Sequence, residues 1–162
     1  MWRVQSSPLA LSMPTCTRST ARSPRCMSPA SPPAVDSLTG LKQRLADRAG
    51  SRPRGAWVVA TGYDDTRLRE QRHPSRLDVD SAVPHHPAVL GRVCGHMSVA
   101  NTLALASAGI DASTPDPPGG TIVRDPTGAP TGLLLETAQD LVWRVTPPLS
   151  GPDIRHAHGA FA

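Results

Sequence analysis

Residues 56–61, AWVVAT, form the short apolar run from which the fold of this chain is best worked out. The run is rich in small and β-branched residues and ends at a turn sequence, GYDD, at residues 62–65, so it predicts a buried strand. A second run, AVLGRV at residues 88–93, ends at CGH, residues 94–96. The sequence therefore predicts two buried strands, each followed by polar or glycine residues.

An amphipathic helix is expected before the first strand. Its apolar positions recur at three- and four-residue spacing with charged residues between them: Leu38, Leu41 and Leu45. This spacing places the three leucines on one helix face. Asp36 or Ser37 is a suitable N-cap, and Gly50 marks the expected end of the helix.

The segment between the two strands, residues 67–83, is polar and is expected to contain a helical turn or two. Asp78 and Asp80 within it are predicted to cap a helix or to face solvent rather than to take part in catalysis. After the second strand, apolar residues from Val99 to Ile110 follow helical spacing, which predicts a helix over residues 99–110.

A β-hairpin is expected from residues 121–124 (TIVR) and 131–135 (TGLLL), which flank the turn sequence DPTG. Two β-prone segments around a turn that ends in Gly are typical of this structure. Residues 136–145 then return to helical spacing, and a pair of prolines ends that helix.

The composition suits a loop-rich piece of a protein better than a self-sufficient domain. The chain has 162 residues, enough for one domain, but it has only three Trp, one Tyr and one Phe and as many as 18 Pro. Large aromatic side chains usually dominate core burial, and Pro removes backbone donors and interrupts helices.

The N-terminal segment, residues 1–35, is rich in Ser, Pro and Arg and contains no acidic residue. Such a segment cannot offset the entropy cost of folding, so we expect disorder. Two interpretations stay open, an organelle transit peptide and a wrongly assigned start without a biological role. The missing amphipathic period favours the second. The expected division of the chain is this leader, a domain over residues 36–155 and a tail over residues 156–162.

The net charge of +4 does not by itself indicate a nucleic-acid partner. The basic excess lies in the N-terminal segment, and no zinc-finger spacing or RNA-binding aromatic pattern accompanies it. We expect no nucleic-acid partner and no membrane partner, since no apolar run is long enough to cross a bilayer. The three cysteines show no disulfide or CxxC pattern, and Cys94 is expected to be a small buried hydrophobe.

Four irregular sequences occur in one order along the chain: GAWVVATGYDD at 55–65, SRLDVDSAVPHHPAVL at 75–90, GHMSVANTLALASAGI at 95–110 and TPDPPGGTIVRDPTGAPTGLLLETA at 114–138. Together they resemble amidohydrolase family 3, over roughly residues 38–155. A single one of these motifs would be weak, but the series is specific. The resemblance implies an α/β fold, namely part of a TIM barrel of the metal-dependent hydrolase type with an inserted β-hairpin. A whole barrel needs about 250 residues.

The resemblance also implies hydrolysis of carbon–nitrogen bonds other than peptide bonds, on a small amide-like substrate in the cytoplasm. A divalent metal, with zinc expected, would activate water in the intact family. The family's HxH metal pair and its catalytic Asp correspond to regions outside the match, so we assign no catalytic residue and expect this chain not to bind the metal. His156 and His158 also have the HxH spacing, but no apolar strand precedes them. We therefore expect a solvent-exposed tail there and not a metal pair.

Three residues are candidates for the functional site through the same resemblance. His96 is expected between a strand and a helix, where it contacts substrate or simply hydrogen-bonds the helix start. Asn101 is expected to bind substrate, orient His96 or cap backbone groups. Glu136 is expected to ligate metal or hold substrate, or to be a first-turn Glu favoured by the helix dipole.

Other polar residues are assigned ordinary roles. Asp64 and Asp65 are adjacent and are expected to point apart, with a role in the turn. His73, His85 and His86 lie in polar segments and are expected to be exposed.

The sequence supports one main function and two alternatives. The main expectation is a fragment of a C–N hydrolase that is inactive alone. The first alternative is a truncated, non-enzymatic protein that associates through exposed strand edges. The second is a basic interaction protein that acts through its N-terminal segment.

Overall fold

The structure is a computed structural model that describes residues 35–148. The predictions for the N-terminal leader, for Cys16 and Cys26, for the tail and for His156 and His158 lie outside the described residues. The helices and strands are α1 (Leu38–Gly50), β1 (Val58–Tyr63), the 3₁₀ turn η1 (Asp65–Arg67), α2 (Arg76–Ala82), β2 (Ala88–Arg92), β3 (Met97–Ala100), α3 (Thr102–Ser107), β4 (Gly120–Arg124), β5 (Pro130–Glu136), η2 (Thr137–Gln139) and α4 (Asp140–Trp143).

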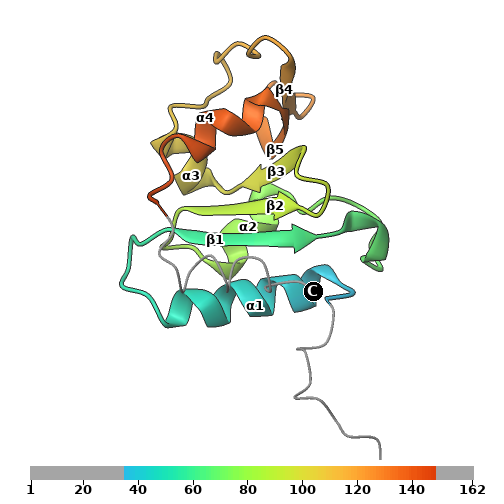
Figure 1. The fold of residues 1–162 in the computed structure, drawn as a ribbon, viewed down its shortest axis with the longest axis vertical. Helices are drawn as coiled ribbons and strands as arrows, with labels where there is room; N and C mark the ends of the chain where they lie inside the picture. Colours follow the sequence, from blue (N-terminus) through green and yellow to red (C-terminus); the bar gives the residue numbers. More distant parts are fainter. Residues whose placement is uncertain (1–34, 149–162) are drawn as a thin grey trace, which may run out of the picture. The chain divides into compact units, whose positions relative to one another are not determined.

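The strands form one five-stranded sheet in the order β1-β2-β3-β5-β4 (Figure 1). β1 and β2 are parallel, with Val58 opposite Ala88, and the other neighbours are antiparallel. The chain is therefore mixed α/β, and both predicted buried strands are confirmed. No helix in residues 35–148 is long and apolar enough to cross a membrane.

Helix α1 begins and ends as its sequence predicts. The hydroxyl of Ser37 accepts a hydrogen bond from the backbone nitrogen of Gly40 at 3.3 Å, which is an N-cap. The leucines at 41 and 45 are 0% and 1% exposed, so the predicted apolar face is the buried one.

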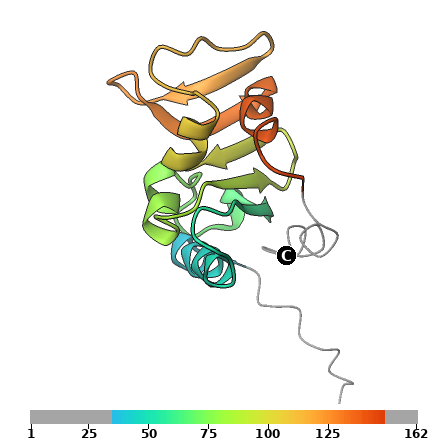
Figure 2. The ribbon, with the colours of Figure 1, turned by 90° about the vertical axis from the view of Figure 1, so that its left-hand side faces the viewer.

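Alternating strand residues divide the core into two clusters on opposite faces of the sheet. The first cluster joins α1 and α2 to Val58, Ala60 and Leu90. The second joins α3 and α4 to Val59 and Val89. Figure 2 shows the sheet between α1 and α4. The parallel strands therefore have α1 and α2 against one face, and the other face is turned toward α4.

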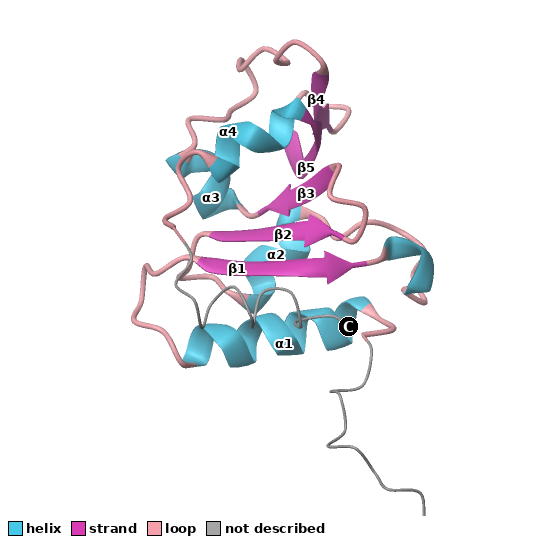
Figure 3. Ribbon diagram, in the orientation of Figure 1, coloured by secondary structure: helices cyan, strands magenta, loops and turns pink. Residues whose placement is uncertain are grey.

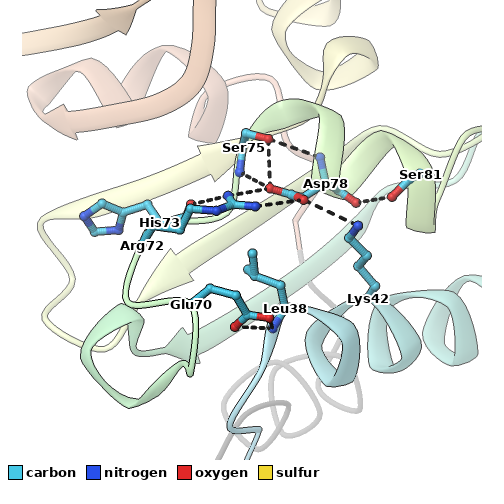
Figure 4. A network of polar contacts seen from close by, with 8 residues as sticks. All are labelled: Leu38, Lys42, Glu70, Arg72, His73, Ser75, Asp78 and Ser81. Carbon is cyan, nitrogen blue, oxygen red and sulfur yellow. Dashed lines mark hydrogen bonds and ion pairs between the residues drawn. The ribbon is translucent and has the colours of Figure 1, made fainter.

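The start of α2 is held by a network around Asp78 (Figure 4). Ser75 and Asp78 form a capping box, in which each side chain accepts a hydrogen bond from the other's backbone nitrogen. Arg72 donates to the same carboxylate at 2.8 Å, and Lys42 of α1 lies 3.4 Å from it. The capping role predicted for Asp78 is confirmed.

Asp80 also has a capping role, in this case for a different helix. Its carboxylate accepts hydrogen bonds from the backbone nitrogen and the hydroxyl of Thr102, at 3.0 and 2.6 Å. Thr102 is the first residue of α3, so Asp80 links α2 to the start of α3.

The helix predicted over residues 99–110 is wrong at its start. Val99 lies in β3, which pairs with β2 on one side and with β5 on the other (Figure 3). Helix α3 begins only at Thr102, because the side chain of Asn101 caps it. Pairing on both edges and full burial of Val99 outweigh the local helical spacing.

The predicted hairpin of β4 and β5 is confirmed, and β5 joins it to the main sheet through β3. Two glycines permit close approaches there. A Cβ on Gly120 would collide with the backbone nitrogen of Ala138, and a Cβ on Gly132 would lie 2.5 Å from the carbonyl oxygen of Ala100. The helix expected from residue 136 starts one residue later, as η2, because Glu136 ends β5 with φ at 51°.

Candidate functional site

A hollow of about 560 Å³ lies at the carboxyl ends of the two parallel strands. Thr61 and Gly62 of β1 and Gly91 and Arg92 of β2 line it from the sheet. Thr61 and Gly91 alternate with the residues of the first core cluster, so this is the sheet face turned toward α4. In open and closed α/β sheets, ligands bind outside the carboxyl ends of the parallel strands. This hollow is therefore the candidate functional site.

A chain of hydrogen bonds holds the wall of the hollow. The indole nitrogen of Trp143 donates to the hydroxyl of Ser98 at 3.2 Å. Ser98 donates in turn to the side-chain oxygen of Gln139 at 2.8 Å, and Gln139 donates to the carbonyl oxygen of Gly95 at 2.9 Å. Ser98 is fully buried. This chain of bonds fixes the β2–β3 turn against the segment from η2 to α4.

Two of the three predicted site residues meet beside this hollow. The Nδ1 atom of His96 lies 3.1 Å from the Oε2 atom of Glu136, and the backbone nitrogen of Glu136 donates to the carbonyl oxygen of His96 at 2.8 Å. The side chains are 67% and 57% exposed, so both remain accessible to a ligand. Gly95 and Met97, on either side of His96, line the hollow.

The expected setting of His96 is wrong, because it does not lie between a strand and a helix. It lies in the turn that joins β2 to β3, two antiparallel strands. The expected first-turn position of Glu136 in a helix is also wrong, since Glu136 is the last residue of β5. The β3–β5 pairing, which places Met97 opposite Leu135, brings the two residues together.

The third predicted residue, Asn101, has a structural role in the fold. It is 0% exposed, and its side-chain oxygen accepts from the backbone nitrogens of Ala88 and Ala104 at 2.9 and 3.0 Å. Its amide nitrogen donates to the carbonyl oxygen of His86 at 2.9 Å. These bonds match the expected capping of backbone groups; contact with substrate stays a prediction.

A charged cluster at the ends of β1 and β2 was not predicted from the sequence. Arg92 donates to Asp65 at 2.6 Å and lies 3.6 Å from Asp64. The expectation that the two aspartates point apart is therefore wrong, since the turn η1 bends both toward one guanidinium. Burial works against the charged form of Asp65 and is the largest single influence on its pKa. The hydrogen bond from Arg92, a backbone hydrogen bond and the nearby charges of Arg92 and His73 together outweigh burial, so the pKa of Asp65 is lowered.

His73 and Tyr63 extend this cluster. The hydroxyl of Tyr63 lies 3.3 Å from Nδ1 of His73, which is 3.6 Å from Asp65. Burial is the main reason that the pKa of Tyr63 is raised. His73 is only partly exposed, contrary to the prediction. The sequence contained one signal of this cluster. Asp64 and Asp65 follow one strand, and Arg92 stands at the end of the next strand.

Two further burial predictions are wrong, and one holds. His86 is only 7% exposed, because its Nδ1 lies 2.9 Å from the carbonyl oxygen of Ala56. Cys94 is exposed because it lies in the β2–β3 turn and not within a strand. The hydrogen bond with Arg92 is the main reason that the pKa of the Cys94 thiol is lowered. His85 is exposed as predicted.

The described residues do not form a complete metal site. Within residues 35–148 no group of three or more His, Cys, Asp and Glu side chains is placed to hold one ion. His96 and Glu136 supply two neighbouring donors, whereas catalytic zinc sites use three protein ligands. A full ligand set would need donors from beyond this part of the chain.

The fold resembles part of solved metal-dependent hydrolases. An uncharacterized metal-dependent hydrolase from Pyrococcus furiosus aligns with a TM-score of 0.51 and 25% identity, over 76% of this chain and 22% of that one. A second, from Pyrococcus horikoshii OT3, aligns with a TM-score of 0.50 over 69% of this chain and 19% of that one, at 24% identity.

Residues 27–161 match the model of the Amidohydrolase family, and the chain belongs to that family. It is 37% identical over 117 residues to YtcJ of Bacillus subtilis, whose name assigns it provisionally to the amidohydrolases. It is 38% identical over 112 residues to the N-substituted formamide deformylase of Arthrobacter pascens. These matches cover 72% and 69% of this chain and 22% and 21% of the relatives, so the chain spans about a fifth of their length.

Proposed function

We propose that this chain forms part of a hydrolase that acts on carbon–nitrogen bonds other than peptide bonds, and that it supplies one side of the substrate site. The observation that carries the proposal is the pairing of His96 with Glu136 at 3.1 Å, beside the hollow at the carboxyl ends of β1 and β2. The name of the Arthrobacter pascens relative, a formamide deformylase, supports the choice of bond.

In this proposal the described residues are an early part of a TIM barrel. β1 and β2 would be neighbouring barrel strands, with α1 and α2 on the outside and the face turned toward α4 on the inside. The parallel pairing of β1 with β2 and the packing of both helices on one face support this arrangement. The hairpin of β4 and β5 would be an insertion that carries Glu136 to the site.

The roles proposed for single residues follow from this placement. Glu136 would contribute one metal ligand, and His96 would contact the substrate. Asn101 would serve the substrate site by fixing β2 and α3, because its side chain is buried and both its oxygen and its nitrogen are hydrogen-bonded. A divalent ion, with zinc as the proposed metal, would supply Lewis-acid activation of water when the whole ligand set is present.

The chain by itself is proposed to be inactive and to lack a bound metal, because its described residues bring together only two candidate donors. We place the protein in the cytoplasm, without a nucleic-acid or membrane partner. A specific observation favours the alternative of a non-enzymatic, associating protein: β1 and β4 are at the edges of the described sheet, and strand edges invite pairing with other chains.

The test compares the purified chain with a chimera. In the chimera, the matching segment of the Arthrobacter pascens deformylase is replaced by that of this chain. We expect zinc-dependent release of formate from N-substituted formamides by the chimera and none by the chain alone. A folded chimera without activity would contradict the proposed function, and hydrolysis at enzyme rates by the chain alone would contradict the proposed inactivity.

A further inference from the structure

Three polar side chains in the wall of the hollow, Trp143, Ser98 and Gln139, are already hydrogen-bonded. The indole nitrogen of Trp143 donates its one hydrogen bond to Ser98. The Ser98 hydroxyl donates to Gln139, and the Gln139 amide nitrogen donates to the carbonyl oxygen of Gly95. Beside these three side chains a ligand meets the indole of Trp143, and the exposed carboxylate of Asp140 is an acceptor that stays accessible in the lining.

Two of the residues that line the hollow from the sheet are glycines, Gly62 and Gly91, and contribute no side chain to it. Gly62 has φ at 94°, a conformation that other residues rarely adopt. A Cβ on Gly91 would lie 3.2 Å from the Cγ2 atom of Thr61, closer than an ordinary contact. Larger residues at both positions are disfavoured, so the space above the strand ends stays available to a ligand.

The charge of the hollow does not favour an anion. Its one arginine, Arg92, is paired with Asp65 at 2.6 Å and lies near Asp64 at 3.6 Å. Asp140 stands exposed among the lining residues. An anionic ligand would have to compete with the carboxylates at Arg92, and a neutral apolar group would not.

We infer that this hollow binds an uncharged apolar group, aryl or alkyl, carried by the substrate next to its amide, and that Trp143 is a specificity-determining residue. Gly95 and Met97 line the hollow on either side of His96, which puts such a group beside the His96–Glu136 pair. The identification of the ligand as an amide rests on the proposed function; its apolar, uncharged character rests on the hollow itself.

The test uses the isolated chain, labelled with ¹⁵N, and three probes: benzamide, acetamide and benzoate. We expect benzamide to shift the backbone signals of Gly62, Gly91 and Gly95 and the indole signal of Trp143 in a saturable way. Because a phenyl ring adds apolar contact, benzamide should bind about tenfold or more tightly than acetamide. Benzoate should bind more weakly than benzamide because of its charge. Equal binding of the three probes, or no saturable shift at these residues, would overturn the inference.

Two variants of Trp143 sharpen the test. Trp143→Phe keeps an aromatic wall and should bind benzamide within about threefold of the original chain, whereas Trp143→Ala should bind about tenfold more weakly. Trp57→Phe is the matched control, because Trp57 is half-buried and does not line the hollow. This variant should bind benzamide as tightly as the original chain does. Unchanged affinity in a folded Trp143→Ala would overturn the role of Trp143, and the titration of the original chain does not depend on any variant.

The outcome can be separated from that of the proposed function. Benzamide binding by the chain together with an inactive chimera would reject the C–N hydrolase while the apolar site stands. An active chimera without benzamide binding at these glycines would reject the apolar site alone.

Discussion

The imidazole of His96 and the carboxylate of Glu136 lie 3.1 Å apart although 40 residues separate them in the chain. The pairing of β3 with β5 brings them together, because Met97 and Leu135 are register partners in the sheet. Both side chains are more than half exposed. An exposed pair of polar side chains contributes little to stability, so a pair at this position is better suited to a ligand than to the fold.

The first prediction concerns the small contribution of this pair to folding. Glu136→Gln and His96→Asn should each change the free energy of unfolding by less than about 0.5 kcal/mol, with a coupling below about 1 kcal/mol in a double-mutant cycle. Urea denaturation of the four chains measures this. A coupling of several kcal/mol would show that the pair serves the fold.

Asn101 should behave in the opposite way. Asn101→Ala removes an N-cap and leaves the backbone groups of Ala88 and His86 without their buried partner. We expect a loss of about 2–4 kcal/mol in the free energy of unfolding. Thermal or urea denaturation measures this loss, with Thr121→Ala, at an exposed residue of β4, as a control. A loss below about 0.5 kcal/mol would contradict the structural role.

Asp78 should make stability depend on pH. Burial disfavours its charge, but hydrogen bonds from Arg72 and Ser75 outweigh this and hold its pKa well below the usual value. A carboxyl with a lowered pKa in the folded state stabilises the fold above its unfolded pKa of about 3.9, and this contribution declines as pH falls further.

Asp78→Asn is therefore expected to cost about 1–2 kcal/mol at pH 7. The difference in the free energy of unfolding between the variant and the original chain should become progressively smaller below about pH 4. Urea denaturation at a series of pH values measures both. A difference that is independent of pH down to pH 2 would show that the charge of Asp78 plays no part.

Cys94 should react in the folded protein, since its thiol is exposed and its pKa is lowered chiefly by the hydrogen bond with Arg92. Iodoacetamide should alkylate it without denaturant, and the midpoint pH of the alkylation rate should lie below that of an ordinary cysteine thiol. Peptide mass spectrometry separates Cys94 from Cys16 and Cys26. Alkylation of Cys94 only after unfolding would contradict its placement in the β2–β3 turn.

Local patterns predicted those elements whose apolar residues follow one clear period. Helix α1 and the first two strands are examples, because three leucines at helical spacing and two short apolar runs each admit a single interpretation. The prediction failed at Val99, whose strand exists only because β2 and β5 lie on either side of it. Such pairing depends on residues far away in the chain and leaves no local period.

The candidate site shows the same division. The resemblance to a family pointed to His96 and Glu136. Their contact depends on β3, and the local spacing of apolar residues predicted a helix there instead of a strand. The cluster around Arg92 could not be predicted for a related reason, since the turn η1 bends Asp64 and Asp65 toward a residue at the end of another strand. Burial of His86 likewise depends on a carbonyl oxygen 30 residues earlier in the chain.

The role of the His96–Glu136 pair is tested most directly by the metal content and kcat/KM of the deformylase chimera, compared between Glu136 and Glu136→Gln. We expect the Gln variant to fold, to hold less zinc and to lose kcat/KM on the order of a hundredfold. His96→Asn should keep its metal and lose activity chiefly through KM. A Gln variant with full zinc content and unchanged kcat/KM would contradict the assignment of the His96–Glu136 pair to the active site.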